Sequence, residues 1–397
     1  MHQSTVFFLV LAALLLTACS QDTAPDGFAP SSDRLPVTFG YYAARTAATR
    51  TLDTQQATTR AQEETFVDGV TNRTIPKGQR VGIFGFYQGP DAWTPKKFTA
   101  DFMYNQPLVA GTATDVTEKA ADGKTDTTVV RCALSYVNPT DQRYWPNTPG
   151  DKLAFIAYYP WNEAPADDKL ASLDTYIQPV FTKGGGIGAF CFKVAEKAED
   201  QLDFMVSDSV VNQTKPGIND RVRLTFHHAL SAITATVTMS QDLIDAGGKI
   251  TNMHYSISGV RRQGTCKPTV DNKGKMTFVW NDLTTDATFT TGDAATDAAR
   301  CLVMIPQPLS NAKLTITYDI EFHEKDKDDG QDYVSYSYRN NVATFDLSKT
   351  SGGTGVSAWR PGLRYNYNVI VSLTAINFTP SIRPWTTGTM ETDLNQQ

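Results

Sequence analysis

An all-β protein built from β-sandwiches is predicted by three features of this 397-residue sequence. Apolar and polar residues alternate with a period of two along most of the chain, as half-buried strands require. No long window shows the apolar stripe of an amphipathic helix. The alternating segments are rich in Thr, Val, Tyr and Phe, and turns containing Gly, Pro, Asn and Asp separate them. We therefore expect sandwiches rather than an α/β enzyme fold.

The first element along the chain is an export signal. Residues 6–16 form a run of Val, Phe, Leu and Ala that is too short to cross a bilayer, which takes roughly 20 residues. It fits the apolar core of a signal peptide. The run ends in Leu16, Thr17, Ala18 and Cys19, which resemble a bacterial lipobox. The resemblance implies that residues 1–18 are removed and that Cys19 is lipidated; the alternative is an ordinary buried cysteine.

Net charge and cysteine content limit which partners this chain can bind and which cysteine chemistry it can have. The formal net charge is −6, so the overall field of the chain does not favour nucleic acid. Four cysteines besides Cys19 would lie in an exported compartment, where disulfides can form. They are Cys132, Cys191, Cys266 and Cys301. Four cysteines allow three pairings, and the sequence leaves open whether any disulfide forms.

Residues 19–65 are predicted to be a tether and a loop around one isolated strand. Residues 20–36 and 43–65 are rich in Ala, Thr, Ser, Asp, Gln and Arg and poor in large apolar groups, which is typical of flexible segments. The sequence LPVTFGYY, residues 35–42, predicts a short strand between them.

Two sandwich domains are predicted after this segment, at residues 66–215 and 216–397. The boundary is placed in the polar stretch VVNQTKPGIND, residues 210–220, which lies between two apolar strand patterns. Strands are expected at 152–160, 189–194, 221–226, 233–239, 276–280 and 365–373.

A β-hairpin is predicted near the end of the second domain. Alternation over residues 313–322 places Leu314, Ile316, Tyr318, Ile320 and Phe322 on one face. The partner strand places Val334, Tyr336 and Tyr338 on one face, and the acidic stretch 323–332 is the expected loop.

Catalytic chemistry finds little support in the residues. The histidines after the signal are His227, His228, His254 and His323, and adjacent strand residues such as His227 and His228 point to opposite faces. The sequence contains no HExxH, GxSxG or CxxC spacing. We expect no catalytic residue, no cofactor and no metal site. A hydrolase would need a pocket with perturbed carboxyl groups.

Aromatic landmarks along the chain carry a family resemblance. They are YWPNTPGDKLAFIAYYP at 144–160, LDFMVSD at 202–208, VRLTFHHALSAI at 222–233 and WRPGLRYNYNVIVSLTAINFTPSIRPW at 359–385. Each is weakly specific alone, but their order behind a lipobox resembles the fimbrillin family, including its Mfa-like branch. Members of that family are pilin-like subunits of type V pili in Gram-negative anaerobes.

The resemblance implies two tandem transthyretin-like β-sandwich domains and an assembly route. The precursor is an outer-membrane lipoprotein, palmitate-modified, and an Arg-specific protease cuts the loop behind its first strand. The vacated groove then accepts an extended segment of another pilus subunit. Arg50 in ATRT and Arg60 in TTRA look most similar to the cleavage context, and Arg45 is less favoured because it lies close to the strand end. The alternative is that these arginines are solvated loop residues.

The C-terminal segment LTAINFTPSIRPW is similar to a donor strand. It offers Ile376, Phe378, Ile382 and Trp385, with Pro380 and Pro384 interrupting regular pairing. It is either the donated strand or the last strand of the second sandwich. The polar tail behind it favours an accessory, tip or anchor subunit over the main polymerising subunit.

The sequence therefore predicts a non-enzymatic pilus subunit with a further role in adhesion to a host or bacterial surface ligand. The alternative is a monomeric surface lipoprotein that binds glycan or host protein without polymerising.

Overall fold

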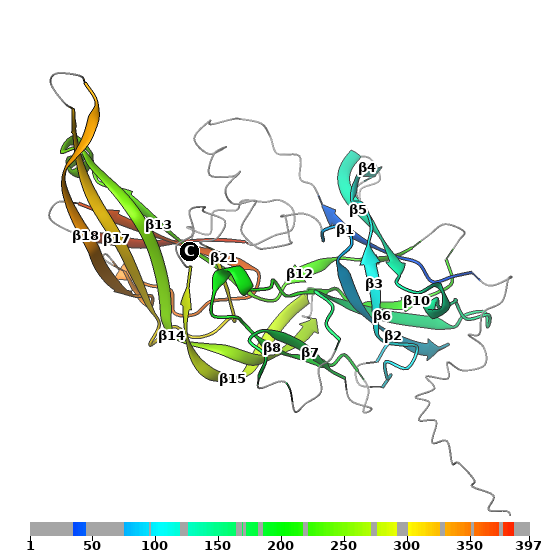
Figure 1. Ribbon diagram of the computed structural model, residues 1–397. Coiled ribbons are helices and arrows are strands. Elements are labelled where there is room, and N and C mark those ends of the chain that lie inside the picture. The colour runs from blue at the N-terminus through cyan, green and yellow to red at the C-terminus, as the bar shows by residue number, and fades with distance from the viewer. Residues whose placement is uncertain are drawn as a thin grey trace, which may run out of the picture.

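The protein is described here by a computed structural model that is built mostly of β-strands (Figure 1). The structure describes residues 35–44, 75–94, 97–119, 126–163, 169, 172–181, 186–216, 221–270, 276–291, 301–325, 330–350, 353–372 and 376–384. Within these residues the α-helix is α2, Gln241–Asp245. No helix in this part of the chain combines the length and apolarity needed to span a membrane. The predicted β-rich fold is confirmed.

The first lobe is a ten-stranded sheet that curls back on itself. Its path runs β11 (Val222–Leu224), β1 (Phe39–Ala44), β5 (Asp126–Tyr136), β3 (Met103–Ala110), β2 (Arg80–Gly89), β6 (Lys152–Tyr159), β9 (Met205–Ser207) and β12 (Phe226–His228). Two more strands, β4 (Thr114–Lys119) and β10 (Val210–Gln213), pair with β5 and β6. Because only Thr225 separates β11 from β12, the two ends of the path are brought together. The rings of Tyr41 and Phe226 meet there, with centroids 6.1 Å apart.

The second lobe contains two further sheets. One has the order β18 (Asp332–Asp346), β17 (Lys313–Lys325), β14 (Gly248–Val270), β8 (Ala189–Lys193) and β7 (Tyr176–Val180), and β15 (Met276–Thr290) also pairs with β14. The other has the order β16 (Leu302–Met304), β13 (Ser231–Met239), β21 (Leu363–Val371) and β22 (Ile376–Pro384). A two-stranded hairpin joins β19 (Lys349–Thr350) to β20 (Gly353–Thr354).

Strand pairing crosses the predicted domain boundary in both directions. The strands β7 and β8 precede residue 215 but belong to the sheet of β14. The strands β11 and β12 follow it but pair with β1 and β9. The predicted strand 221–226 is likewise split into β11 and β12. The division into domains 66–215 and 216–397 remains a prediction.

The strand β6 separates two hydrophobic cores. Leu153, Phe155 and Ala157 face the core inside the curled sheet. The intervening residues, Ala154 and Ile156, face the larger core that the first lobe shares with the second. The predicted strand at 152–160 was expected to alternate like a half-buried strand; β6 is instead buried on both faces because it lies between two apolar layers.

The predicted hairpin is present as β17 and β18, and its register pairs Ile316 with Ala343 and Phe322 with Tyr336. The strands are longer than expected, since residues 323–325 of the expected loop belong to β17. Cross-strand pairs explain the extension. Lys325 lies opposite Asp332, and the Tyr333 hydroxyl donates to Glu324 Oε2 at 3.2 Å.

All four described cysteines are free thiols. Cys132 is buried in the core of the curled sheet, whereas Cys266 and Cys301 are buried in the larger core. Burial raises the pKa of Cys301 to about 11, so the thiol stays neutral and inert at ordinary pH. The sequence left open whether any disulfide forms, and in the structure all four of these thiols are free.

Buried tyrosines predict a loss of stability at high pH. Burial raises the pKa of Tyr158 and Tyr367 well above the ordinary value of 10.0. A folded-state pKa above the unfolded value gives stability that is complete below pH ~10 and is lost as pH rises toward the folded pKa. Melting temperatures measured between pH 8 and pH 11.5 should therefore fall. The fall should be shallower in Tyr158→Phe than in the wild type, while Tyr104→Phe, which changes a half-exposed ring, should leave it unchanged. An identical slope in all three proteins would contradict the prediction.

Candidate functional site

The first strand is clamped between two neighbours along its backbone. Phe39 pairs with Leu134 of β5 in antiparallel register and with Val222 of β11 in parallel register. The Val222 amide donates to the carbonyl of Thr38 at 2.8 Å. Removing β1 would leave unpaired N–H and C=O groups on both neighbouring strands, and such an edge binds another strand readily.

The residues before β1 are held as well. The Val37 amide donates to the Arg143 carbonyl at 2.8 Å, and the Trp145 amide donates to the Leu35 carbonyl at 3.0 Å. The Tyr136 hydroxyl donates to the carbonyl of Val37 at 3.2 Å. The clamped segment therefore runs from residue 35 to residue 44.

Side chains of this segment fill a row of apolar pockets. Val37, Phe39 and Tyr41, spaced by two, are buried on one side of the strand. The Phe39 ring packs edge-on against Phe155, with centroids 5.0 Å apart. The Tyr41 hydroxyl donates to the Ile75 carbonyl at 3.3 Å. A replacement strand would have to supply apolar groups at the same alternate positions.

The predicted strand 35–42 thus corresponds to a real element whose regular part is shifted toward its C-terminal end. The strand β1 continues to Ala44, two residues into the predicted loop 43–65. The candidate cleavage residues Arg45, Arg50 and Arg60 lie outside the described residues, as does the lipidation residue Cys19.

The candidate donor segment lies in the other lobe. Ile376, Phe378 and Ile382 are on β22, which pairs with β21 from Val371–Ile376 to Leu363–Pro384. This strand ends the four-stranded sheet, and Ile382 is half-buried against the larger core. Trp385 lies outside the described residues. The structure therefore shows β22 paired within its own subunit, as the last strand of the described residues, in a different sheet from β1.

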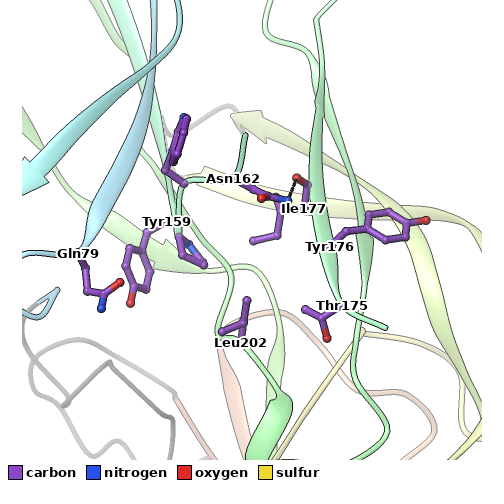
Figure 2. Close-up of a pocket in the computed structure, with 9 residues that line it drawn as sticks. Gln79, Tyr159, Asn162, Thr175, Tyr176, Ile177 and Leu202 are labelled. Atoms are coloured by element: carbon purple, nitrogen blue, oxygen red, sulfur yellow. Dashed lines mark hydrogen bonds between the residues drawn. The ribbon is translucent and has the colours of Figure 1, made fainter. Parts of the chain in front are cut away.

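A cleft of about 380 Å³ lies where the first lobe meets β7 (Figure 2). It is lined by Gln79, Tyr159, Pro160, Trp161, Asn162, Thr175, Tyr176, Ile177 and Leu202. The Asn162 amide group is fixed by donating to the Ile177 carbonyl at 3.1 Å. None of the lining side chains is charged, so the cleft suits a small neutral ligand. Sequence reasoning missed it, because its residues come from four separate segments.

In the described part of the chain, the histidine and carboxyl side chains are not arranged as a catalytic site would require. His227 and His228 lie on opposite faces of β12, with nitrogen atoms 2.8 Å from Asp208 and 2.7 Å from Asp203 respectively. Among the described residues, no three His, Cys, Asp or Glu side chains gather as a metal site would require. The pKa of Asp91 is lowered by the hydrogen bond from Lys97, and that of Asp319 by the hydrogen bond from Asn252. Neither carboxyl lines the cleft.

A strand held by main-chain hydrogen bonds on both sides and by a row of buried side chains is the kind of element on which donor-strand complementation depends. The profile of the fimbrillin-like family matches residues 59–385, which is most of the chain. The chain therefore belongs to the fimbrillin-like family. It is a cell-surface fimbrial protein of the Mfa-like type, and its family is structural rather than enzymatic. A search of the curated proteins finds no match.

Three solved structures illustrate the low similarity of this chain to known structures. A fimbrial protein from Bacteroides vulgatus is 16% identical with a TM-score of 0.49, covering 88% of this chain and 99% of its own. A candidate cell adhesion protein from Bacteroides uniformis is 15% identical with a TM-score of 0.49, over 90% and 100% of the two chains. The tip fimbrial protein Mfa3 from Porphyromonas gingivalis is 9% identical with a TM-score of 0.34, over 88% and 100%. The assignment rests on the family match.

Proposed function

We propose that this protein is a pilus subunit that assembles by strand exchange at the position of β1. The observation that supports it is the two-sided pairing of β1 together with the buried row Val37, Phe39 and Tyr41. In this proposal Cys19 carries the lipid that anchors the precursor to the outer membrane. An Arg-specific protease then cuts behind β1, at Arg50 or Arg60, with Arg45 as the less favoured site.

Cleavage behind β1 makes the strand exchangeable because it removes the covalent link to the rest of the sheet. While the chain is intact, release of β1 is opposed by immediate rebinding, since the tether keeps its local concentration high. Once cut, the strand competes with any segment of matching alternation. The proposed donor carries Ile376, Phe378, Ile382 and Trp385 and would leave β21 to enter the groove of the next subunit.

Two finer features belong to the same proposal. The sheets of the two lobes would correspond to tandem transthyretin-like β-sandwich domains, with residues near 215 crossing between them. The protein would be a structural or an accessory (tip or anchor) subunit of the pilus, with a further role in adhesion. Its partners would be other pilus subunits and a host or bacterial surface ligand.

A second candidate function is favoured by the uncharged cleft. Its aromatic and amide groups suit a glycan, and a monomeric surface lipoprotein could bind glycan or host protein there without polymerising. Such a protein would keep β1 in place after protease treatment.

Limited trypsin digestion of the mature protein separates the two functions. We expect one cut behind β1, release of the strand and formation of ladders that survive in unheated SDS gels. Arg50→Ala, Arg60→Ala and Arg45→Ala identify the site, because only one of them should block both the cut and the ladder. A cut protein that stays monomeric and retains residues 35–44 on intact-mass analysis would overturn strand exchange in favour of the monomeric lipoprotein.

A further inference from the structure

The hairpin of β17 and β18 projects from the end of the second lobe, beyond the strands that cover its inner face (Figure 1). Near its base the inner face is core. Leu314 and Ile316 are fully buried, and their cross-strand partners Phe345 and Ala343 pack with them. This face therefore begins as a normal sandwich layer.

Toward the tip, the same row of side chains becomes exposed. Tyr338 pairs with Ile320 and is 52% exposed, and Tyr336 pairs with Phe322 and is 58% exposed. The two tyrosine rings meet edge-on with centroids 4.8 Å apart, and the Tyr338 ring also contacts Phe322. We call Tyr336 and Tyr338 the tyrosine pair. It is an aromatic surface continuous with the core but left uncovered.

Hydrogen bonds to the Asp319 carboxylate fix the backbone beside the tyrosine pair. The backbone amide of Asn340 donates to Asp319 Oδ1 at 2.7 Å, and the side-chain amide of Asn252 donates to Asp319 Oδ2 at 2.7 Å. Asn340 has a φ of 56°, at the point where an extra residue shifts the register between β17 and β18. These hydrogen bonds therefore hold Tyr338 on the inner row, and both tyrosines belong to the regular strand ladder.

The tyrosine pair lies at the same end of the molecule as Val371, the residue at which the proposed donor strand would swing out and which we call the hinge. The last residue of β21, Val371, accepts a hydrogen bond from the Ser240 amide at 2.9 Å, directly before α2. The chain leaves α2 through Gly247, whose carbonyl accepts from the His323 amide of β17 at 2.9 Å. Phe322, which precedes His323 in β17, is the partner of Tyr336. A few hydrogen-bonded residues thus connect the hinge to the tyrosine pair.

We propose that the tyrosine pair docks onto the next subunit, a second copy of this chain, beside the exchanged strand. This inference rests on the proposed strand exchange. If β22 swings out while tethered at Val371, it draws the acceptor lobe of its neighbour to the end where the tyrosine pair protrudes. The second contact then forms within one complex, at a high effective concentration. Tyrosine suits such a contact, since it offers a large apolar ring and a polar tip at low entropic cost.

The test compares assembly of the trypsin-activated full chain in three forms. Tyr336→Ser combined with Tyr338→Ser should still form ladders, but the rate of ladder growth should fall about tenfold, as expected for losing about 1.4 kcal/mol at a docking contact. Val342→Ser changes a 63% exposed side chain on the same strand, paired with Thr317 on the other face, and should assemble at the wild-type rate. Equal rates for the wild type and the double variant would overturn the docking proposal alone.

A cross-linking measurement gives the partner directly. With p-benzoyl-phenylalanine at position 336, irradiation of ladders should link this position to a peptide from residues 35–228 of a second copy. Links confined to the same chain, or links only to an added host protein or glycoprotein, would overturn the proposal while leaving strand exchange intact. Absence of ladders in the wild type would overturn both proposals together, which distinguishes the two failures.

Discussion

Phe39→Ala is expected to lower the free energy of unfolding by about 3–5 kcal/mol, the usual range for truncating a fully buried phenylalanine. Phe39 is 0% exposed, and its ring packs edge-on against Phe155 and Tyr136. The substitution removes both contacts and leaves a cavity under a strand that the rest of the sheet cannot close, because β5 and β11 hold its backbone in place. Urea unfolding followed by tryptophan fluorescence measures the change.

Thr38→Ala is the matched control, since it changes the adjacent residue while leaving the Thr38 carbonyl available to the Val222 amide. It should cost less than about 1 kcal/mol. After cleavage behind β1, Phe39→Ala should also release residues 35–44 faster than the wild type on native size exclusion. A Phe39→Ala protein as stable as the Thr38→Ala protein would show that β1 contributes little to the fold.

The alternation of side chains predicted most strands of this protein because it depends only on local sequence. The hairpin and the isolated first strand were predicted in this way. Most of their ends differ by a few residues, but β18 continues to Asp346, well beyond the predicted end at Tyr338. The ends of strands are harder to predict, because cross-strand pairs can extend a strand into residues that look like a loop. Lys325 and Asp332, read as loop residues, lie opposite each other in the ladder.

Pairing between distant segments could not be predicted from alternation. The meeting of β11 with β1 and of β8 with β14 joins residues from both sides of a polar stretch that marks a boundary by composition alone. The cleft was missed for the same reason, since it depends on how Gln79, Asn162 and Leu202 come together. Alternation also showed that Tyr336 and Tyr338 share a face, but not that the covering layer ends before it reaches them.

Strand exchange depends most strongly on the apolar side chains of the donor segment. Phe378→Asp is expected to abolish ladder formation, by a factor of 100 or more. An extended donor places Ile376 and Phe378 in one row of apolar pockets, and a carboxylate buried in a pocket without a partner costs several kcal/mol. Each 1.4 kcal/mol of that cost is a tenfold loss of affinity. Gel ladders and the strand-exchange rate after trypsin cleavage measure the effect.

Thr379→Asp is the control that tests the direction of the donor, because the neighbouring position points to the other face of an extended strand. It should retain ladders. The substitution at Phe378 also alters β22 in its own subunit, where residue 378 pairs with Val369. The fold of this variant is therefore checked by its ability to accept a wild-type donor and form capped dimers. Capped dimers without ladders identify β22 as the donor. Equal loss in both variants would indicate that the segment stabilises its own sheet and donates nothing.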